Sequence, residues 1–304
     1  MKNKFALIKF AENMAKISVK HEIIRKAPEK IFNWYIEKLL PYSLKEIEIC
    51  TSAGYEIILP MLNGDNAALL EKIMEKVEAD CYDLGVRAVI ADNGIAISEN
   101  FFVPDGNIVK AFFVKVIMEK YLKSAEIDAA NGSVIIIEGN EDETMALARF
   151  IYGGVNHLGI IVEEGNQADY EEFADEVFDD CGLMLNFGRR GSYLLKEADI
   201  IINLSKATKG YESFYKKGAC YIELSASDEK LKSFLSKREG VLTVDKFSVE
   251  YAGNRLSLAQ FELISFLTSP DFTRYANSKF NSKYFEQTAK SIEKQNIKIR
   301  NLNM

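Results

Sequence analysis

The second half of the chain alternates short apolar runs with amphipathic stretches. Residues 133–137 (SVIII) form a β-branched run directly after the turn signal Asn131-Gly132, which is typical of a strand buried on both faces. The next segment, TMALARFIYGG, has apolar residues at helical spacing. This alternation predicts a doubly wound parallel sheet of about six strands, a Rossmann-like α/β domain. The further strands are expected at residues 158–164, 183–187, 199–205, 219–225 and 241–247.

The first half has a less regular pattern, which is typical of a smaller mixed α/β domain. It contains a strand-like run FALIKF, a helical pattern at PEKIFNWYIEKLL, and two strand-like runs separated by a hairpin-like turn at Ala53-Gly54. A long helical pattern, NIVKAFFVKVIMEKYLKSAEI, is expected to span the junction of the two halves. We therefore predict a mixed α/β, substrate-type N-terminal domain at 1–125, a Rossmann-like domain at 126–268 and a C-terminal helical tail at 269–304.

Charge and composition narrow the range of partners. The formal net charge is -7, and a nucleic-acid binder needs a basic surface to release counterions, so no nucleic-acid partner is expected. No run of about 18 uncharged apolar residues occurs, so we expect a cytoplasmic protein without a membrane partner. The four cysteines lie far apart without CxxC spacing and the two histidines lie in different halves. No metal site is therefore predicted.

Several short fragments follow one another in a characteristic order along the chain. They are Phe5-Ala6-Leu7-Ile8, Thr51-Ser52-Ala53-Gly54, Leu59-Pro60-Met61-Leu62, Glu99-Asn100-Phe101, Asp105-Gly106-Asn107, Glu197-Ala198-Asp199-Ile200 and Glu250-Tyr251-Ala252. The helix-then-strand junction resembles that of the last enzyme of pyrrolysine biosynthesis. The layout as a whole resembles that of the two-domain reductases related to shikimate dehydrogenase, most closely the long-chain acyl-(acyl carrier protein) reductases that make fatty aldehydes.

This resemblance implies a nicotinamide cofactor whose pyrophosphate rests on the N-terminus of the first helix, where glycines give close approach. The turn has one glycine, Gly139, followed by Asn140, where three glycines are expected. The other two positions hold Glu141 and Thr144, or Asp142 and Met145, depending on the register. Acidic side chains cap a helix well but repel a pyrophosphate. We therefore expect no cofactor, or NAD if any.

Further candidate residues follow the strands of the predicted sheet, where doubly wound folds bind ligands. Glu163 ends the second strand, and an acid there fits the free ribose diol of NAD rather than the 2'-phosphate of NADP. Asn203 and Ser205 end the fourth strand, and Glu223 and Ser225 end the fifth. We assign Gly139, Asn140, Glu163, Asn203 and Ser205 to a cofactor-type site.

The segment that resembles the TGN motif of the family holds Asn107 and Lys110, which we assign to a substrate or ligand cleft. Lys110 has the charge to hold an anionic ligand. The carrier-protein reductases also need an acyl-accepting thiol on the helix expected at 256–267, and this segment has no cysteine. Gln260 and Ser265 stand in that neighbourhood instead, and a serine without a paired base is a poor acyl acceptor.

The departures from the family pattern favour a divergent, non-catalytic or repurposed member that binds a small molecule or a protein partner, and homo-oligomerisation stays open. The alternative is an NAD-dependent oxidoreductase acting on an acyl thioester or a small oxo acid. Retention of two domains and six expected strands favours that alternative. Whether the protein is an enzyme is left open, leaning toward no, and no catalytic residue is identified.

Overall fold

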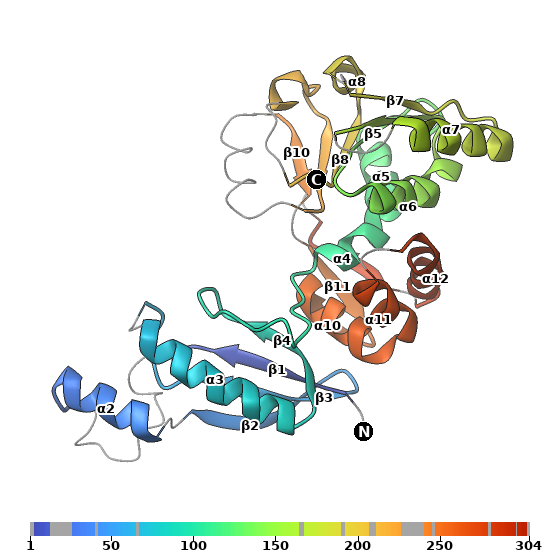
Figure 1. The fold of residues 1–304 in the computed structure, drawn as a ribbon. Helices are drawn as coiled ribbons and strands as arrows, with labels where there is room; N and C mark the ends of the chain where they lie inside the picture. The colour runs from blue at the N-terminus through green and yellow to red at the C-terminus, as the bar shows by residue number, and fades with distance from the viewer. Residues whose placement is uncertain are drawn as a thin grey trace. The chain divides into compact units, whose positions relative to one another are not determined.

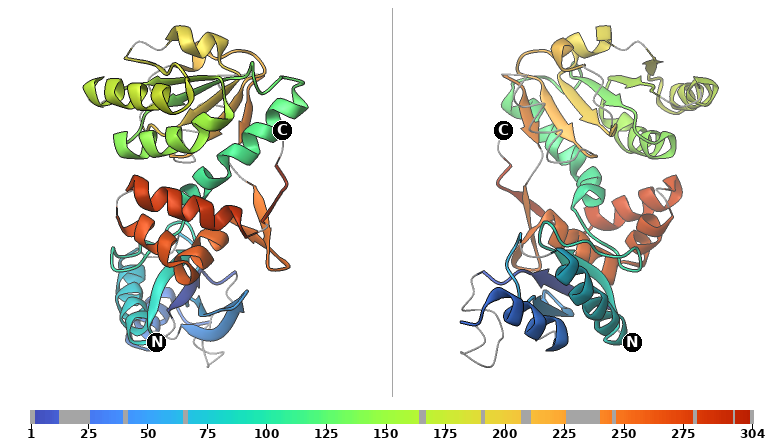
Figure 2. Two further views of the ribbon diagram at one scale, coloured as in Figure 1. Left: turned by 90° about the vertical axis from the view of Figure 1, so that its right-hand side faces the viewer. Right: turned by 60° about the vertical axis from the view of Figure 1, so that its left-hand side comes forward.

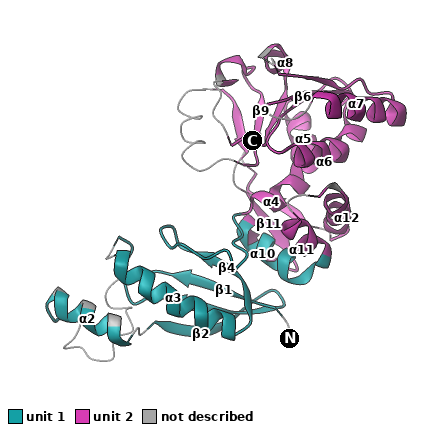
Figure 3. Ribbon diagram, in the orientation of Figure 1, with its two compact units in different colours: residues 1–105, 259–270 teal, residues 106–258, 271–304 magenta. Residues whose placement is uncertain are grey.

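The computed structural model of the chain forms two compact units (Figures 1 and 3). Unit 1 comprises Met1–Asp105 and Ala259–Pro270, and unit 2 comprises Gly106–Leu258 and Asp271–Met304. The predicted division at 125/126 and 268/269 is a different division of the chain, and those domain boundaries stay a prediction. The structure describes residues 3–12, 26–39, 42–64, 67–163, 167–189, 192–206, 211–225, 240–244, 247–278, 281–295 and 297–302.

Unit 1 contains a four-stranded mixed sheet in the order β2-β3-β1-β4, in agreement with the predicted mixed α/β class. Strand β1 pairs in parallel with both β3 and β4, whereas β2 is antiparallel to β3. Helix α3 packs its apolar side against the sheet, and both contribute to one buried cluster (Figure 1). The bounds are β1 Lys4–Lys9, α2 Glu29–Leu39, β2 Ser43–Ile49, β3 Ser52–Ile58, α3 Ala67–Asp83 and β4 Val86–Ala91.

The hairpin of unit 1 turns earlier than the sequence predicts. Ile49 pairs with Ser52, so the two-residue turn is Cys50-Thr51, with Cys50 at a φ of 54°. Ala53 and Gly54, the predicted turn, lie inside β3. Gly54 is needed there for space, because a Cβ would lie 2.6 Å from the ring of Phe5. The prediction was wrong because the glycine marks a close approach within a strand instead of a turn.

Unit 2 contains the predicted doubly wound sheet. Its six strands run in the order β10-β9-β8-β5-β6-β7, and every neighbouring pair is parallel. Counted from β5, this is the strand order 3-2-1-4-5-6 of dinucleotide-binding folds, so the fold class is confirmed. The bounds are β5 Ser133–Ile137, β6 His157–Ile161, β7 Asn186–Gly188, β8 Ile200–Asn203, β9 Cys220–Glu223 and β10 Leu242–Val244.

Helices cover this sheet, as Figure 2 shows from two further sides. The long helical pattern at the junction is divided into a short helix, a 3-10 turn and a longer helix, which are α4, η2 and α5. Predicted strand residues 164, 245 and 246 lie outside the described part of the chain. The bounds are α4 Asn107–Lys110, η2 Ala111–Phe113, α5 Val114–Ser124, α6 Glu141–Ile151, η3 Tyr152–Gly154, α7 Gln167–Cys181, α8 Ser192–Glu197 and η4 Tyr211–Phe214.

The C-terminal part of the chain is not only helical. Strand β11 (Ser248–Tyr251) pairs in antiparallel fashion with β12 (Asn254–Ser257) and with β13 (Lys298–Arg300), which the sequence did not predict. Three helices lie between β12 and β13: α10 (Leu258–Thr268), α11 (Pro270–Asn277) and α12 (Ser282–Glu293).

Packed aromatic rings join helices α11 and α12 to the preceding part of unit 2. The Phe285 ring of α12 lies 4.8 Å from that of Phe112 and 5.6 Å from that of Phe150, between ring centroids. Phe112 also meets Tyr275 of α11 edge-on, at 5.6 Å. Aromatic side chains bury large apolar areas, so these contacts stabilise the tail against the helices that precede and follow β5.

Candidate functional site

The carboxyl ends of β5, β6, β8 and β9 meet at one edge of the parallel sheet of unit 2, here called the carboxyl edge. At its centre β5 is followed by Glu138 and Gly139. A Cβ on Gly139 would lie 2.1 Å from the main-chain oxygen of Leu204, which follows β8. Gly139 therefore lets two segments of the sheet edge pack backbone to backbone.

Helix α6 begins with a side-chain cap at this edge. Asn140 is the N-cap residue, and its Oδ1 accepts a hydrogen bond from the Glu143 N–H at 3.2 Å. Thr144 is fully buried and donates from Oγ1 to the Asn140 carbonyl at 2.7 Å. Glu141, Asp142 and Glu143 occupy the first turn. Their charges complement the helix dipole, so this helix start is stabilised by its own side chains.

The carboxyl of Glu143 has an altered acidity. Burial raises its pKa to about 7, and the nearby ammonium group of Lys206 opposes the rise. Near neutral pH this group is therefore divided between its charged and neutral forms.

Two of the predicted site residues meet across the end of β5. Ser205, which follows β8, donates from Oγ to Glu163 Oε2 at 2.7 Å. Glu163 follows β6, and β5 lies between β6 and β8 in the sheet. The side chains therefore bridge the topological switch point, where doubly wound folds bind ligands. The Glu163 N–H also donates to Glu138 Oε2, which ties the bridge to the residue that ends β5.

Glu138 is a buried carboxylate of the same acidic turn, which was not assigned to the site from the sequence. It is 1 % exposed, and Oε1 accepts a hydrogen bond from the Tyr170 hydroxyl of α7 at 2.7 Å. Burial, followed by this hydrogen bond, raises the pKa of Tyr170 above its ordinary value, so the phenol stays protonated and remains a donor. A buried carboxylate needs such partners. The tyrosine could have been suspected only from its place on the buried side of the helical pattern.

Glu223 at the end of β9 forms a second buried acid centre. It accepts hydrogen bonds from the Asn203 side chain at 2.9 and 3.0 Å, the Tyr221 hydroxyl at 2.7 Å and the Ser225 N–H at 2.9 Å. Asn203 also donates to the Ser205 carbonyl at 3.0 Å. The two candidate pairs at the ends of β8 and β9 are thus parts of one hydrogen-bonded group.

The two candidate cleft residues join the same group. Lys110 is 4 % exposed, and its Nζ donates to the main-chain oxygen of Glu223 at 2.8 Å. Nζ also lies 3.3 Å from Oδ1 of Asn107, which begins α4. The geometry therefore brings every predicted site residue to the carboxyl edge, as an acid-rich network in which the side chains largely satisfy one another.

The fold implies a dinucleotide cofactor, and the residues of the carboxyl edge do not fit its pyrophosphate in this arrangement. With Gly139 as the first glycine of the motif, the other two positions are Glu141 and the fully buried Thr144. Each carboxylate about 4 Å from a phosphate would cost on the order of 4 kcal/mol at an effective dielectric of about 20. The hydrogen bond between Ser205 and Glu163 also lies at the topological switch point, the region where doubly wound folds bind their ligands. Within the described residues, no group of His, Cys, Asp and Glu side chains could hold a metal ion.

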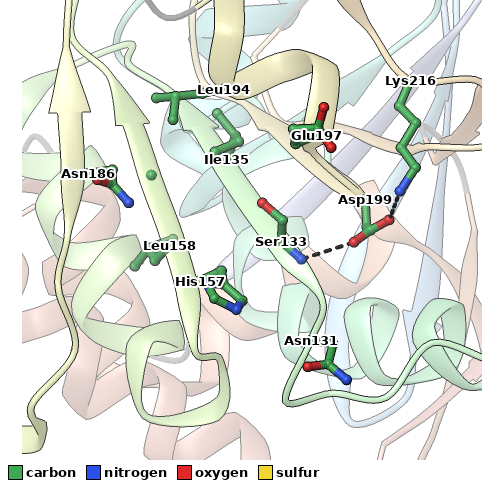
Figure 4. Close-up of a pocket in the computed structure, with 11 residues that line it drawn as sticks. Asn131, Ser133, Ile135, His157, Leu158, Asn186, Leu194, Glu197, Asp199 and Lys216 are labelled. Atoms are coloured by element: carbon green, nitrogen blue, oxygen red, sulfur yellow. Dashed lines mark hydrogen bonds and ion pairs between the residues drawn. The ribbon is translucent and has the colours of Figure 1, made fainter.

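The opposite edge of the same sheet, here called the amino edge, contains a pocket of about 380 Å³ (Figure 4). Ser133, His157 and Asp199 lie at the starts of β5, β6 and β8 and line it. The carboxylate of Asp199 lies between the Ser133 N–H, at 3.1 Å, and the Lys216 ammonium, at 2.6 Å. No motif in the sequence predicted this pocket.

No protein-family model matches the chain, and no curated protein matches its sequence. Among the described residues, no helix is long and apolar enough to cross a membrane.

Several solved structures are similar to the chain at low identity. Shikimate 5-dehydrogenase from Listeria monocytogenes, in complex with shikimate and NAD, is 9 % identical over 94 % of this chain and 96 % of that chain, with a TM-score of 0.35. L-tryptophan dehydrogenase from Nostoc punctiforme is 12 % identical over 95 % and 88 %, with a TM-score of 0.35. Hetero-hexameric glutamate dehydrogenase from Thermus thermophilus is 10 % identical over 96 % and 76 %, with a TM-score of 0.33. All three are dehydrogenases by name, and the Rossmann-like fold of unit 2 itself follows from its strand order.

Proposed function

We propose that the carboxyl edge of unit 2 is the ligand site of a divergent, Rossmann-type reductase relative, and that in its present arrangement it does not accept a dinucleotide pyrophosphate. The observation on which this proposal rests is the 2.7 Å hydrogen bond between Ser205 and Glu163 across the end of β5. The ligand is then a small molecule or a segment of a protein partner without phosphate groups, bound where the family binds its cofactor.

The charge of the carboxyl edge supports this proposal. Glu138 and Glu223 are buried, and the first turn of α6 adds three acidic residues. Lys110 is engaged with the end of β9, so it is not placed over the start of α6 to neutralise a phosphate. A neutral or cationic ligand meets no repulsion at such an edge, whereas an anionic ligand does.

A second candidate function is that of an NAD-dependent oxidoreductase acting on an acyl thioester or a small oxo acid. The position of Glu163 favours it, because a carboxylate after the second strand of the fold suits a ribose diol. The names of the similar structures agree with this class. Under this candidate, the bond from Ser205 would have to break when the cofactor binds, and Glu163 would turn to the ribose. If the resemblance to the acyl-(acyl carrier protein) reductases also holds for the substrate, that substrate would be an acyl thioester.

Calorimetric titration with NADH and NADPH at low salt separates the two candidates. We expect the natural protein to bind neither cofactor with a dissociation constant below about 1 mM. This value corresponds to a binding free energy of about -4 kcal/mol. Micromolar binding of NADH would overturn the proposal and support the oxidoreductase. NADPH is expected to bind more weakly than NADH in either case, because Glu163 would face its 2'-phosphate.

Two variants test the cause of the weak binding. Ser205→Ala removes the bridge and leaves Glu163 available to a ribose, and Glu141→Gly removes one charge from the start of α6. Each is expected to strengthen NADH binding, together by about tenfold or more. Glu172→Gln, on an exposed position of α7, is the charge control and is expected to leave binding unchanged. Unchanged affinity in both test variants would mean that neither the bridge nor the acidic turn excludes the cofactor.

A further inference from the structure

The amino-edge pocket lies beside Gly159 of β6, and residues of β5, β7 and α8 also line it. A Cβ on Gly159 would lie 2.7 Å from Cδ1 of Ile135. The Ile135 side chain therefore lies directly against the backbone of Gly159. The pocket volume of about 380 Å³ lies within the range of about 300–1,000 Å³ that small-molecule sites occupy.

The inner surface of the pocket is apolar. Ile135 of β5 and Leu194 of α8 line it beside Gly159 of β6 and are here called the apolar floor (Figure 4). Ile135 pairs with Gly159 in the sheet, so both lie on the same face. Ile135 is buried, and Leu194 is partly buried. A hydrocarbon group that packs on this floor would remove apolar surface of both the ligand and the protein from water, which favours binding.

The rim of the pocket has an unbalanced charge. Two carboxylates, Glu197 and Asp199, and one ammonium group, that of Lys216, line it. Asp199 and Lys216 form an ion pair at 2.6 Å, and Asp199 also accepts a hydrogen bond from Ser133, so these two charges are matched. Glu197 is exposed and pairs with no cation within the described part of the chain. The rim therefore presents one negative charge beside the apolar floor.

The remaining polar groups of the rim can accept or donate hydrogen bonds. His157 is exposed at the start of β6, where its imidazole can take part in hydrogen bonds. The side-chain amides of Asn131 and Asn186 each offer one acceptor oxygen and two donor hydrogens. An ammonium group has three donors and no acceptor, so it can bond to a carboxylate and to such acceptors together.

We infer that the amino-edge pocket binds a small aliphatic amine, with its ammonium group at Glu197 and its hydrocarbon body on the apolar floor. This site lies at the opposite edge of the sheet from the proposed ligand site and does not rest on the proposed function. A carboxylate of the same length would meet the negative rim. An alcohol of the same length would bury the same hydrocarbon without the ion pair.

Ligand-observed NMR titration of the full chain tests the inference with n-pentylamine, n-pentanol and pentanoate as probes. We expect pentylamine to bind at least about tenfold more tightly than pentanoate, and pentanol to fall between them. Equal binding of the three probes, or no saturable binding of pentylamine, would overturn the inference.

Two variants place the probe in the pocket. Glu197→Gln is expected to weaken pentylamine binding about fivefold, the size expected for a partly exposed ion pair, and to leave pentanol binding unchanged. Gly159→Ala narrows the floor and is expected to weaken both probes; the nearest atom, Ile135 Cδ1, is the end of a flexible side chain, so the fold can adjust. Glu172→Gln and Gly188→Ala are the matched controls, since a Cβ on Gly188 would meet nothing within 4 Å.

The two variants also separate the site from other surfaces. If Glu197→Gln and its control Glu172→Gln reduce pentylamine binding equally, the amine binds through the general acidity of the protein and the inference is wrong. If Gly159→Ala lowers the melting temperature so far that it cannot be titrated, the selective loss of amine binding, but not of pentanol binding, in Glu197→Gln decides alone.

Discussion

The two edges of the unit 2 sheet are formed by the opposite ends of the same strands, but one edge is closed by hydrogen-bonded side chains and the other contains an open pocket. At the carboxyl edge, Glu138 and Glu223 are buried and hydrogen-bonded, and Ser205 and Glu163 bridge the end of β5. At the amino edge, a pocket of about 380 Å³ is open and Glu197 on its rim is exposed. In a doubly wound fold the carboxyl edge is the usual ligand site.

The difference shows that the location of polar residues alone does not identify an open site. The carboxyl edge has the greater number of polar groups, and many of them are hydrogen-bonded to one another. A ligand must replace some of those hydrogen bonds to bind there. The amino edge has fewer, and its pocket needs no such exchange. Three experiments test this contrast, beginning with the largest effect.

Gly139→Ala should be the most disruptive single change at the carboxyl edge. Its Cβ would lie 2.1 Å from the Leu204 carbonyl oxygen, and backbone cannot move aside as a flexible side chain can. We expect the free energy of unfolding to fall by about 3 kcal/mol, as in severe overpacking, measured by urea unfolding followed by circular dichroism. Gly188→Ala in β7 is the control, with a change within about 1 kcal/mol, since a Cβ there meets nothing within 4 Å. Equal stability of the two variants would show that β5 and β8 do not pack this closely.

The central strands and the fold class could be predicted from the sequence because strands buried on both faces are continuous apolar runs. The sheet of β11, β12 and β13 could not. Its strands are short and mostly polar, and β13 pairs with a strand about fifty residues earlier, as in the pair Glu250 and Lys298. No local pattern encodes such a pairing.

The position of the candidate residues at one edge of the sheet could also be predicted, whereas their role in binding stays a prediction. The strand ends placed Glu163, Asn203 and Ser205 at one edge, since parallel strands end together. The bond between Glu163 and Ser205 depends on β5 lying between their strands, and this order is a property of the whole sheet. The amino-edge pocket is lined by residues from β5, β6, β7 and α8, which are far apart in the sequence, so no local motif predicts it.

The acidic start of α6 should make stability depend on pH. Burial raises the folded-state pKa of Glu143 from 4.5 to about 7, so the folded protein holds this proton more tightly than the unfolded chain does. The resulting stabilisation is fully present below about pH 4.5 and is lost as the pH rises through about 7. Because Glu143 is only partly buried by exposed area, we expect on the order of 1 to 2 kcal/mol.

The variant Glu143→Gln isolates this contribution. The glutamine side chain has no proton to lose in this range. Between pH 5 and pH 8, the free energy of unfolding of the variant should therefore fall by about 1 to 2 kcal/mol less than that of the natural protein. Urea unfolding at several pH values in that range measures the difference. Parallel pH profiles for the two proteins would mean that Glu143 is hydrated in the folded state. Glu172→Gln serves as the exposed control on α7 and should leave the profile unchanged.

The smallest expected effect compares the loss of one polar partner at each edge. Lys216→Met removes the ammonium group that pairs with Asp199, whereas Tyr221→Phe removes one donor from the buried carboxylate of Glu223. Lys216 is 46 % exposed beside an open pocket, so water can replace its group, and the variant should lose less than about 1 kcal/mol of stability. Water has no comparable access to Glu223, which is 3 % exposed, so Tyr221→Phe should lose about 1 to 2 kcal/mol. Urea unfolding of both variants measures the order. A larger loss of stability in Lys216→Met than in Tyr221→Phe would contradict this contrast. It would mean that the hydrogen bonds and ion pairs of the amino edge contribute more to stability than those of the carboxyl edge.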